Sequence, residues 1–344
     1  MASFVELLDC DLRAELTSLL VQIPAGRVST YGALADALGD RVAARWVGEF
    51  LLDHPHGPDC VCHRVVRRNG DPGLYIAGDA VAKLGRLATE GVPISDGRVV
   101  LDRPFTTFTG PATLRRLTEF QNGVRSQLDL RTLRRPIQRV AALDVAYLSP
   151  CRALAACAVF KSAPWRLMQT HEVETTATFP YISGYLAFRE LPALLELWRH
   201  ATADISVDLA IIDGNGILHP RRAGIAACFG LLADVPTIGI GKSLLCGSVD
   251  LTGLRAGATR PIIHCDEMIG LAVRSTNRSR PIFVSPGNHC DLSQPAEIVQ
   301  DLFAGHRLPE PLHQADRLTK QRVREIREVR CQQPGWPSLD AASR

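Results

Sequence analysis

The sequence predicts an α/β protein made of two units, a small helical unit followed by a larger unit with a mixed sheet. Three observations support this prediction. The chain has 344 residues, a length that suits about two domains. Its N-terminal part reads as short helices joined by tight, glycine-containing turns, the pattern of helix-turn-helix modules. From residue 139 onward, apolar strands alternate with helices, which is typical of an α/β layer architecture.

The N-terminal unit is expected to contain helices and one short reactive loop. Gly39 and Pro55 mark the ends of two of these helices, because glycine and proline are common stop signals. The expected order is a helix over 4–21, a turn over 23–30, helices over 31–39 and 41–53, the β-like stretch CHRVVR at 62–67, a turn at 69–70 and a helix over 79–90.

The C-terminal unit is expected to alternate strands and helices. Its first three strands follow each other through short turns and the later ones through helices, so the predicted sheet is mixed. The third strand carries polar β-branched residues, which indicate one exposed face. The expected order is strands over 139–148, 152–160 and 167–179, a helix over 186–201, a strand over 208–214, a helix over 223–234 and a strand over 236–242.

A basic segment joins the two units. The stretch RPFTTFTGPATLRRLTEF leads from a link rich in Thr, Gly and Pro into a helix, so we predict domains over 1–107 and 108–330, with a tail over 331–344. Residues 115–139 hold seven arginines against Glu119 and Asp129. Such a run suits a polyanion, and a solvated helix face explains it equally well.

The composition excludes several classes of protein. The N-terminal stretch carries acidic residues inside its apolar spacing, so it is no signal peptide, and no stretch is long and apolar enough to span a membrane. The ten cysteines lie mostly in apolar runs, which favours reduced, buried thiols. We therefore expect a cytoplasmic monomer that does not associate with membranes.

Cys62 is the first candidate for chemistry, in the stretch DCVCHRVVRRNG. A cysteine becomes nucleophilic when nearby positive charge or a base favours its thiolate. His63 could be that base, and Glu90 could hold the imidazole in one tautomer. A buried inert thiol and a zinc ligand remain alternatives, although Cys60 and Cys62 lack both the usual C-x2–4-C spacing and a second ligand pair.

Three acidic residues form the second candidate site. Asp144 and Asp213 lie in or at the end of apolar strands, and Glu190 lies in a helix. A carboxylate in a core strand costs on the order of several kcal/mol unless it is paired or bound to metal. A shared Mg²⁺ would satisfy all three, with salt bridges to arginines as the alternative. Lys242 could support the attacking water or the developing phosphate charge.

Four motifs in the N-terminal unit carry a family resemblance: IPAGRVSTYGALADALG, AARWVGEFLLDHP, VCHRVVRRNG and ATEGV. Their order and spacing resemble the DNA-binding domain of the O6-alkylguanine-DNA alkyltransferases. The resemblance implies a winged-helix-like fold in which Cys62 irreversibly takes the alkyl group from a flipped-out guanine. It also implies that His63 and Glu90 activate Cys62 through water. Arg45 would fill the gap in the duplex, and Tyr31 would help to rotate the nucleotide.

The same motifs depart from the family in three places. Val61 replaces the proline before the cysteine, and His54 replaces an asparagine eight residues before it. The loop GDPGLYIAGDAVAK is one residue longer and lacks a Gly-Gly pair. Alkyltransferase-like proteins that only bind damage therefore give a second interpretation of this unit.

A second set of motifs covers about residues 112–325: VAALDVAY, FPYISGYLAFRELP, DGNGILHPRRAGIA, PTIGIGKSLLCG, PIFVSPGN and HRLPEPLHQADRLT. These resemble endonuclease V, which implies a ribonuclease H-like fold. By this resemblance Lys242 is the catalytic lysine and Tyr181 a wedge that stacks where the base was. The implied metal ligands are Asp144, Glu190, Asp213 and Asp316, and the implied base-pocket or strand-binding residues are Gly184, Leu186, Gly214, Gly216 and His219.

Together the resemblances imply a bifunctional DNA-repair enzyme. The nuclease would use Mg²⁺, for which Mn²⁺ can substitute, to nick DNA at the second phosphodiester bond 3′ to deoxyinosine. The N-terminal unit would transfer alkyl groups from O6-alkylguanine to Cys62. Two alternatives stay open: a nuclease with a non-catalytic damage-binding module, and an endonuclease for inosine-containing RNA.

Overall fold

The computed structural model describes residues 10–131, 133, 136–162 and 164–331 of the chain. Two compact units are present: unit 1 comprises Met1–Phe120 and Phe179–Ser183, and unit 2 comprises Gln121–Thr178 and Gly184–Arg344. The division falls within helix α6 (Thr113–Gln127), beyond the boundary expected near residue 108. The expected tail lies, apart from residue 331, outside the described residues.

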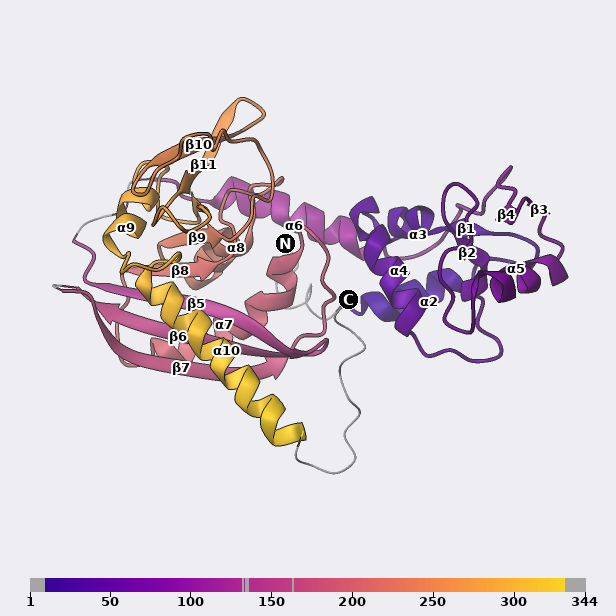
Figure 1. Ribbon diagram of the computed structural model, residues 1–344, viewed down its shortest axis with the longest axis horizontal. Coiled ribbons are helices and arrows are strands. Elements are labelled where there is room, and N and C mark those ends of the chain that lie inside the picture. Colours follow the sequence, from indigo (N-terminus) through magenta and orange to yellow (C-terminus); the bar gives the residue numbers. More distant parts are fainter. Residues whose placement is uncertain (1–9, 132, 134–135, 163, 332–344) are drawn as a thin grey trace. The chain divides into compact units, whose positions relative to one another are not determined.

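Unit 1 consists of short helices and two small two-stranded sheets (Figure 1). β1 pairs with β2 in parallel, and β3 pairs with β4 in a hairpin. In chain order, the elements described for this unit are α2 (Leu12–Leu20), β1 (Ser29–Thr30), α3 (Tyr31–Leu38), η1 (Arg41–Ala43), α4 (Ala44–Asp53), η2 (Cys62–Arg64), β2 (Val65–Val66), α5 (Ala80–Thr89), β3 (Ile94–Ser95) and β4 (Arg98–Val99).

The turn between α3 and α4 is encoded locally. Gly39 ends α3 with a φ of 109°, which residues with a side chain rarely adopt, and a Cβ there would lie 2.4 Å from the backbone nitrogen of Arg115. Asp40 starts the next turn by accepting a hydrogen bond from the backbone N–H of Val42 at 3.0 Å. The predicted helices over 31–39 and 41–53 are therefore confirmed, with a 3₁₀ turn at the start of the second.

The helix that ends at Leu20 begins later than the sequence predicted. Asp11 has an extended backbone, and its carboxylate accepts hydrogen bonds from the N–H groups of Arg13 at 2.9 Å and Ala14 at 3.0 Å. These bonds make Asp11 an N-cap, so a helix begins at Leu12 instead of running through from residue 4. Residues 4–9 of the predicted helix lie outside the described residues.

Within the described residues, unit 2 is built on an eight-stranded mixed sheet in the order β10-β11-β12-β9-β8-β5-β6-β7. β5, β8 and β9 are parallel, and the other neighbours are antiparallel. This is the mixed sheet that the sequence predicted. The strands are β5 (Arg139–Ser149), β6 (Arg152–Lys161), β7 (Arg166–Thr176), β8 (Leu209–Asp213), β9 (Thr237–Gly241), β10 (Thr259–His264), β11 (Glu267–Val273) and β12 (Ile282–Pro286).

Helices cover both faces of this sheet (Figure 1). α10 (Glu310–Cys331) crosses one face over β5 and β6, and α7 (Leu186–Ala201) and α8 (Ile225–Ala233) lie on the other, while α9 (Pro295–Asp301) packs near β12. β5 and β6 are thus largely buried, which explains their nearly continuous apolar runs. β7 lies at the sheet edge and alternates between exposed and partly exposed positions, as its polar residues predicted.

The sequence did not predict the hairpin of β10 and β11. Its turn contains Cys265 and Asp266, whose φ angles are 53° and 62°. Two-residue hairpin turns of this kind need positive φ at both central positions, so Asn-Gly or Asp-Gly is the usual signal for them. Cys-Asp is not such a signal, and the hairpin was therefore invisible in the sequence.

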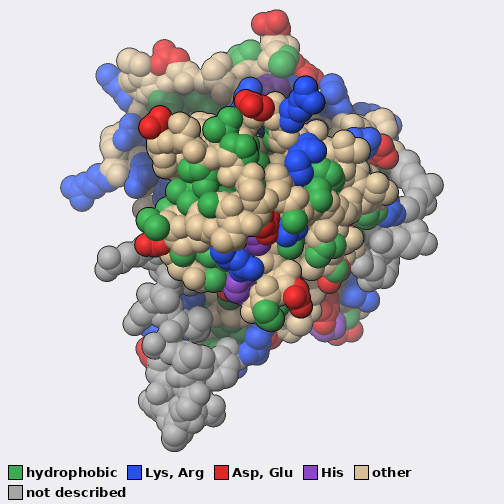
Figure 2. Space-filling view, turned by 90° about the vertical axis from the view of Figure 1, so that its right-hand side faces the viewer, with side chains coloured by type: hydrophobic (Ala, Val, Ile, Leu, Met, Phe, Trp, Pro, Cys, Tyr) green, Lys and Arg blue, Asp and Glu red, His purple; other side chains and the backbone are tan. Residues whose placement is uncertain are grey.

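The surface gives two further facts. Among the described residues, no helix has the length and apolar character needed to cross a membrane. On the face shown in Figure 2, basic side chains lie among hydrophobic and acidic ones. Charges of both signs therefore share that face.

Candidate active sites

Unit 2 brings three carboxylates together at one end of its central strands. Asp144 of β5 and Asp213 of β8 lie side by side because the two strands pair in parallel, with Leu143 opposite Ile212. Helix α10 crosses these strands and adds Asp316. One oxygen from each carboxylate lies within 4.8 Å of the others, and we call these three residues the carboxylate cluster.

Burial and the closeness of the charged groups shift pKa values within the carboxylate cluster. Asp144 is 5% exposed, and burial together with the neighbouring Asp213 raises its pKa well above the usual range. Lys242 Nζ lies among the carboxylates, donating hydrogen bonds to Asp213 and, at 2.7 Å, to Asp316. Although burial opposes its charge, the pKa of Lys242 is raised because these carboxylates stabilise the ammonium.

Glu190 lies close to this cluster but has its own partner. It is 7% exposed on α7 and accepts a hydrogen bond from the hydroxyl of Tyr147 at 2.7 Å. Burial raises the pKa of Glu190 to about 7, and the charge of Asp213 adds to the increase. The structure thus groups Asp144, Asp213 and Asp316 tightly, with Glu190 near enough to respond to Asp213.

The carboxylate cluster fits a divalent metal ion. Oxygen ligands suit hard cations such as Mg²⁺, and an ion would relieve the repulsion that raises the pKa of Asp144. Lys242 provides one positive charge among the three carboxylates of the cluster. The exposed Lys320 donates a hydrogen bond to Asp316, with 2.5 Å between Nζ and Oδ2. Among the described residues, the ion pairs to this cluster come from Lys242 and Lys320 and not from the arginines of the alternative interpretation.

Thr319 supports the cluster from α10, and replacing it should weaken metal use. Its hydroxyl is fully buried and donates to Asp144 Oδ2 at 2.5 Å, which fixes that carboxylate. For the nuclease that the resemblance to endonuclease V implies, we expect Thr319→Val to raise the Mg²⁺ concentration for half-maximal nicking by roughly tenfold, because hydrogen-bond partners of metal ligands orient them. A Mg²⁺ titration of nicking measures this. Thr319→Ser keeps the hydroxyl and should behave like the unsubstituted chain; an unchanged Thr319→Val would contradict the role.

Two of the predicted base-pocket glycines have packing roles inside unit 2. A Cβ at Gly214 would lie 2.3 Å from Ile225 Cγ2, and one at Gly216 would lie 2.0 Å from the carbonyl oxygen of Pro286. A side chain at Gly214 would push against α8, and one at Gly216 would push against the backbone at the end of β12, close in sequence to Asp213. Gly184 has a φ of 81°, in the left-handed region that glycine tolerates.

The backbone at Gly184 is held by the predicted residue His219 and by Arg221. His219 Nε2 donates to the Gly184 carbonyl at 3.1 Å, and Arg221 donates to the same oxygen at 3.0 Å. Burial lowers the pKa of His219 to about 4, with Arg221 adding to the effect, so the ring is neutral. Leu186 begins α7 two residues later, and the predicted wedge, Tyr181, is 66% exposed.

Cys62 is buried at the start of a 3₁₀ turn in unit 1. Its side chain is 3% exposed, and burial, reinforced by Cys60, raises the pKa of the thiol to about 12. The nearby Lys83 and Arg86 act in the opposite direction without outweighing burial. The free chain therefore holds a protonated thiol, which needs a base before it can attack.

His63 and Glu90 form the pair that the sequence predicted. Glu90 Oε1 accepts from His63 Nε2 at 2.7 Å, and Arg64 holds the same carboxylate through Nε and Nη2, both at 2.9 Å. His63 is 1% exposed, and its other ring nitrogen, Nδ1, has no hydrogen-bond partner among the described residues. That nitrogen is the one available to take a proton.

Glu90 makes unit 1 sensitive to acid. Burial alone would raise its pKa, but hydrogen bonds from Arg64 and His63 outweigh it and lower the pKa to about 2. A depressed folded-state pKa contributes stability above the unfolded value that is lost as pH falls toward 2. We expect the free energy of unfolding of Glu90→Gln at pH 7 to be roughly 2–3 kcal/mol lower than that of the unsubstituted chain.

The stability difference from Glu90→Gln should shrink below about pH 4 and vanish near pH 2, because the unsubstituted carboxylate then becomes neutral as well. Urea unfolding at several pH values measures the difference. Pulse proteolysis reads out the unfolded fraction at each urea concentration, and peptides from unit 1 are the ones monitored. The exposed Glu49→Gln serves as control. A difference independent of pH would mean that charge is not the cause.

The two predicted DNA-contacting residues of unit 1 lie on the helix pair. Tyr31 begins α3, and a Cβ at Gly73 would lie 2.9 Å from its hydroxyl, so the loop backbone approaches the ring closely. Arg45 lies in α4 with a side chain 91% exposed, paired with Glu49 at 2.9 Å. Their contacts with a duplex remain predictions.

Sequence reasoning missed four residues that contact these sites. Tyr147 and Thr319 bind the carboxylates, Lys320 pairs with Asp316, and His56 lies 3.6 Å from Cys62 through Nδ1. A signal existed for two of them. Asp316, Thr319 and Lys320 are spaced three and four residues apart, which places them on one face of a helix.

The fold and the two sites define a class of protein. It is a ribonuclease H-like nuclease with a carboxylate site, joined in one chain to a helical DNA-binding domain with a buried cysteine. The family model of endonuclease V matches residues 122–317, and that of the 6-O-methylguanine DNA methyltransferase DNA-binding domain matches residues 11–92. The chain belongs to the endonuclease V family and carries an alkyltransferase DNA-binding domain.

Known relatives support both parts. A bifunctional methyltransferase/endonuclease of Picrophilus torridus is 34% identical over 298 residues, which cover 86% of this chain and 92% of the relative. Endonuclease V of Bacillus subtilis is 28% identical with a TM-score of 0.59, covering 62% of this chain and 93% of that one. Ciona intestinalis endonuclease V, in complex with DNA containing an inosine followed by a ribo-adenosine, is 26% identical with a TM-score of 0.56, covering 62% and 98%. The predicted enzyme classes are thus confirmed.

Proposed function

We propose that the chain repairs DNA at two separate sites. Unit 2 nicks DNA at the second phosphodiester bond 3′ to deoxyinosine, with Mg²⁺ as cofactor. Unit 1 transfers the alkyl group of O6-alkylguanine to Cys62, once per chain. The observation that carries the nuclease is the carboxylate cluster, in which three acidic side chains from β5, β8 and α10 meet around Lys242.

Asp144, Glu190, Asp213 and Asp316 would hold the metal in the nuclease. When bound, Mg²⁺ supplies positive charge that stabilises a phosphodiester in hydrolysis and favours ionisation of water; Mn²⁺ can substitute. Lys242 remains protonated among the carboxylates and is placed to hold the negative charge of the scissile phosphate. The hydroxyl of Tyr147 donates to Glu190 and so keeps that carboxylate in place as a ligand.

Base recognition would use the residues that precede α7 in the chain. Tyr181, in the Phe179–Ser183 segment of unit 1, is exposed and could stack into the space that a flipped base leaves. In unit 2, His219 and Arg221 fix the Gly184 backbone, so that a base meets a preformed surface there. Gly214 and Gly216 keep the end of β8 tightly packed, and Leu186 offers an apolar contact at the start of α7.

Alkyl transfer would proceed by direct displacement at Cys62. The thiol proton passes to His63 Nδ1, directly or through a water, and the imidazolium is stabilised by Glu90. The sulfur–carbon bond forms as the carbon–O6 bond breaks, and the guanine anion that leaves takes up a proton from water, which restores the normal base. Tyr31 and Arg45 would rotate the nucleotide and fill the gap in the duplex.

Two assays on the full chain test the proposal. A duplex with one deoxyinosine should be nicked with Mg²⁺ and remain intact with a chelator. A duplex with labelled O6-methylguanine should pass its label to the protein in a stoichiometric amount. Failure of the first assay with Mg²⁺ or Mn²⁺ overturns the nuclease assignment, and failure of the second overturns the transfer assignment.

RNA that contains inosine is a second candidate substrate for unit 2. The Ciona relative was crystallised in complex with a DNA strand in which a ribo-adenosine follows the inosine, so a ribonucleotide is present next to the inosine in that complex. The duplex-reading class of unit 1 favours DNA for this chain. Cleavage rates on matched inosine DNA and inosine RNA decide between the two; faster cleavage of RNA would reverse our assignment.

A further inference from the structure

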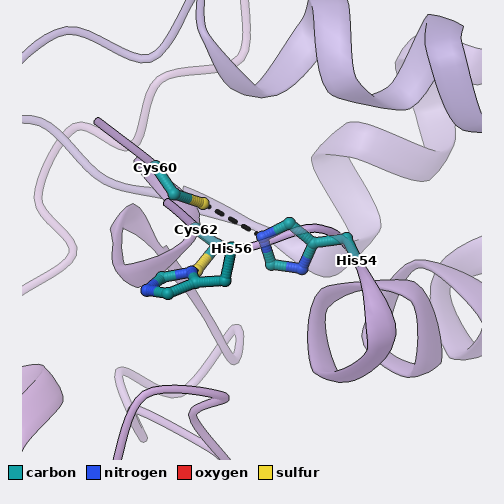
Figure 3. A group of neighbouring side chains, drawn as sticks. All are labelled: His54, His56, Cys60 and Cys62. Atoms are coloured by element: carbon teal, nitrogen blue, oxygen red, sulfur yellow. Dashed lines mark hydrogen bonds between the residues drawn. The ribbon is translucent and has the colours of Figure 1, made fainter. Parts of the chain in front are cut away.

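We propose that His54, His56, Cys60 and Cys62 form a zinc site in unit 1, and we call these residues the loop cluster. His54, His56 and Cys60 lie in the segment that joins α4 to η2, and Cys62 is the first residue of η2. One donor atom from each lies within 4.8 Å of the others. Figure 3 shows the rings of His54 and His56 beside the two cysteine side chains. The cluster is separate from the carboxylate cluster of unit 2.

The spacing of the donor atoms matches tetrahedral zinc. With zinc–sulfur bonds of about 2.3 Å and zinc–nitrogen bonds of about 2.0 Å, ligand nitrogen and sulfur atoms lie roughly 3.6 Å apart. His56 Nδ1 and Cys62 Sγ are 3.6 Å apart. His54 Nε2 and Cys60 Sγ are at hydrogen-bond distance, 3.0 Å, so this pair needs to open by about half an ångström on binding.

The donor set selects the metal. Two imidazole nitrogens and two thiolates form a soft, four-ligand set that prefers zinc over the hard cations suited to carboxylates. In the sequence, two grounds argued against zinc: Cys60 and Cys62 lack the usual C-x2–4-C spacing, and no second ligand pair was apparent. The structure supplies that pair from His54 and His56, which lie at the end of α4.

The ligand rings are held in place before any metal binds. The ring of His54, which is the C-cap of α4, stacks on Phe50 with centroids 5.5 Å apart. The ring of His56 contacts that of His54 edge-on at 5.7 Å and that of Tyr75 at 6.0 Å. His56 is exposed while Cys62 is buried, so an ion can enter from the His56 side and be enclosed.

The consequence for repair depends on the proposed alkyl transfer. Zinc and the alkyl group would compete for the Cys62 sulfur. In the zinc-bound chain Cys62 has already lost its proton, so His63 takes none. On transfer, the sulfur–carbon bond forms as the carbon–O6 bond breaks, and the guanine anion takes up a proton from water. The resulting thioether carries no negative charge and is a poor ligand, so the zinc–sulfur bond breaks and Zn²⁺ leaves. Loss of zinc would then mark a spent chain.

Cobalt substitution tests the site itself without any DNA. Titration of the full chain with Co²⁺ should give about one equivalent with thiolate-to-cobalt charge-transfer absorption, which the all-oxygen cluster of unit 2 cannot produce. His56→Asn and Cys60→Ser should weaken this binding at least about a hundredfold. Each variant removes a ligand itself, which should cost more than the loss of a ligand's hydrogen-bond partner. Because His56 is exposed, its variant should stay folded, which circular dichroism checks.

Matched controls separate the loop cluster from other donors. Cys265→Ser, at an exposed position outside the cluster, and Asp213→Asn in unit 2 should both retain the charge-transfer band. A full chain without the band, or a band unchanged in His56→Asn and Cys60→Ser, overturns the zinc site.

The coupling to repair has its own measurement. The zinc-loaded chain is reacted with O6-methylguanine DNA, and released Zn²⁺ is followed with a colorimetric chelator. We expect release in proportion to methyl incorporation. Incorporation without release overturns the coupling and leaves the site standing. A chain that binds Co²⁺ through sulfur but incorporates no methyl group overturns the proposed transfer instead.

Discussion

Asp144→Asn should reduce nicking of a deoxyinosine duplex by at least about a thousandfold, or roughly 4 kcal/mol of transition-state stabilisation. Asp144 is the most buried member of the carboxylate cluster and lies between Asp213 and α10. The amide keeps the size of the side chain and an oxygen that can accept from Thr319. It removes the charge that a metal ion needs, so the fold should persist while the reaction fails.

The measurement is single-turnover nicking at saturating Mg²⁺, with circular dichroism as a check of folding. Asp204→Asn, at an exposed position, is the matched control and should nick at the unsubstituted rate. Methyl transfer to Cys62 should be unchanged in both variants, because that site lies in unit 1. If Asp144→Asn still nicks efficiently with Mg²⁺, the carboxylate cluster is not the catalytic site.

Cys62→Ala should abolish methyl transfer from O6-methylguanine DNA and leave nicking intact. Its sulfur is the only atom of this side chain that can form the stable bond, so no residual transfer is expected. The substitution removes little volume from a site that is 3% exposed, so the loss of stability should be small, on the order of 1 kcal/mol. Labelled-methyl incorporation and the mass of the modified protein measure the effect.

The same experiment separates transfer from simple damage binding. Cys265→Ser is the control for thiols outside the site, because its side chain is exposed in unit 2. If the unsubstituted chain and Cys62→Ala incorporate label equally, the acceptor lies elsewhere. If neither incorporates label but both bind the lesion with equal affinity, unit 1 is a recognition module, as the substitutions Val61 and His54 in the family motif allow.

The sequence predicted much of the fold because its signals are local. β5, β6 and β8 are continuous apolar runs, and α7 begins and ends at the predicted residues. The helix that ends at Leu20 was predicted to begin too early because its amphipathic spacing continues past Asp11, whose capping carboxylate starts the helix at Leu12. The hairpin of β10 and β11 was missed because Cys265 and Asp266 give no turn signal.

The candidate sites were predicted in part, for a related reason. Asp144 and Asp213 were identifiable because charged residues interrupt apolar strands, and Cys62 because His63 and arginines adjoin it. Their partners were not identifiable by the same logic. Tyr147 and Thr319 are ordinary residues in the sequence, and their roles appear only where α7 and α10 pack against the sheet.

The sequence by itself determined the two-unit α/β organisation, the residue types of each site and the family, because these depend on local pattern. Only the tertiary structure decided which donors share a space. Asp316 reaches Asp144 because α10 crosses β5, and His56 faces Cys62 because the chain turns back after α4. Asp316 and Asp144 are distant in sequence, so their proximity arises from packing of whole elements, and no short stretch of sequence encodes it.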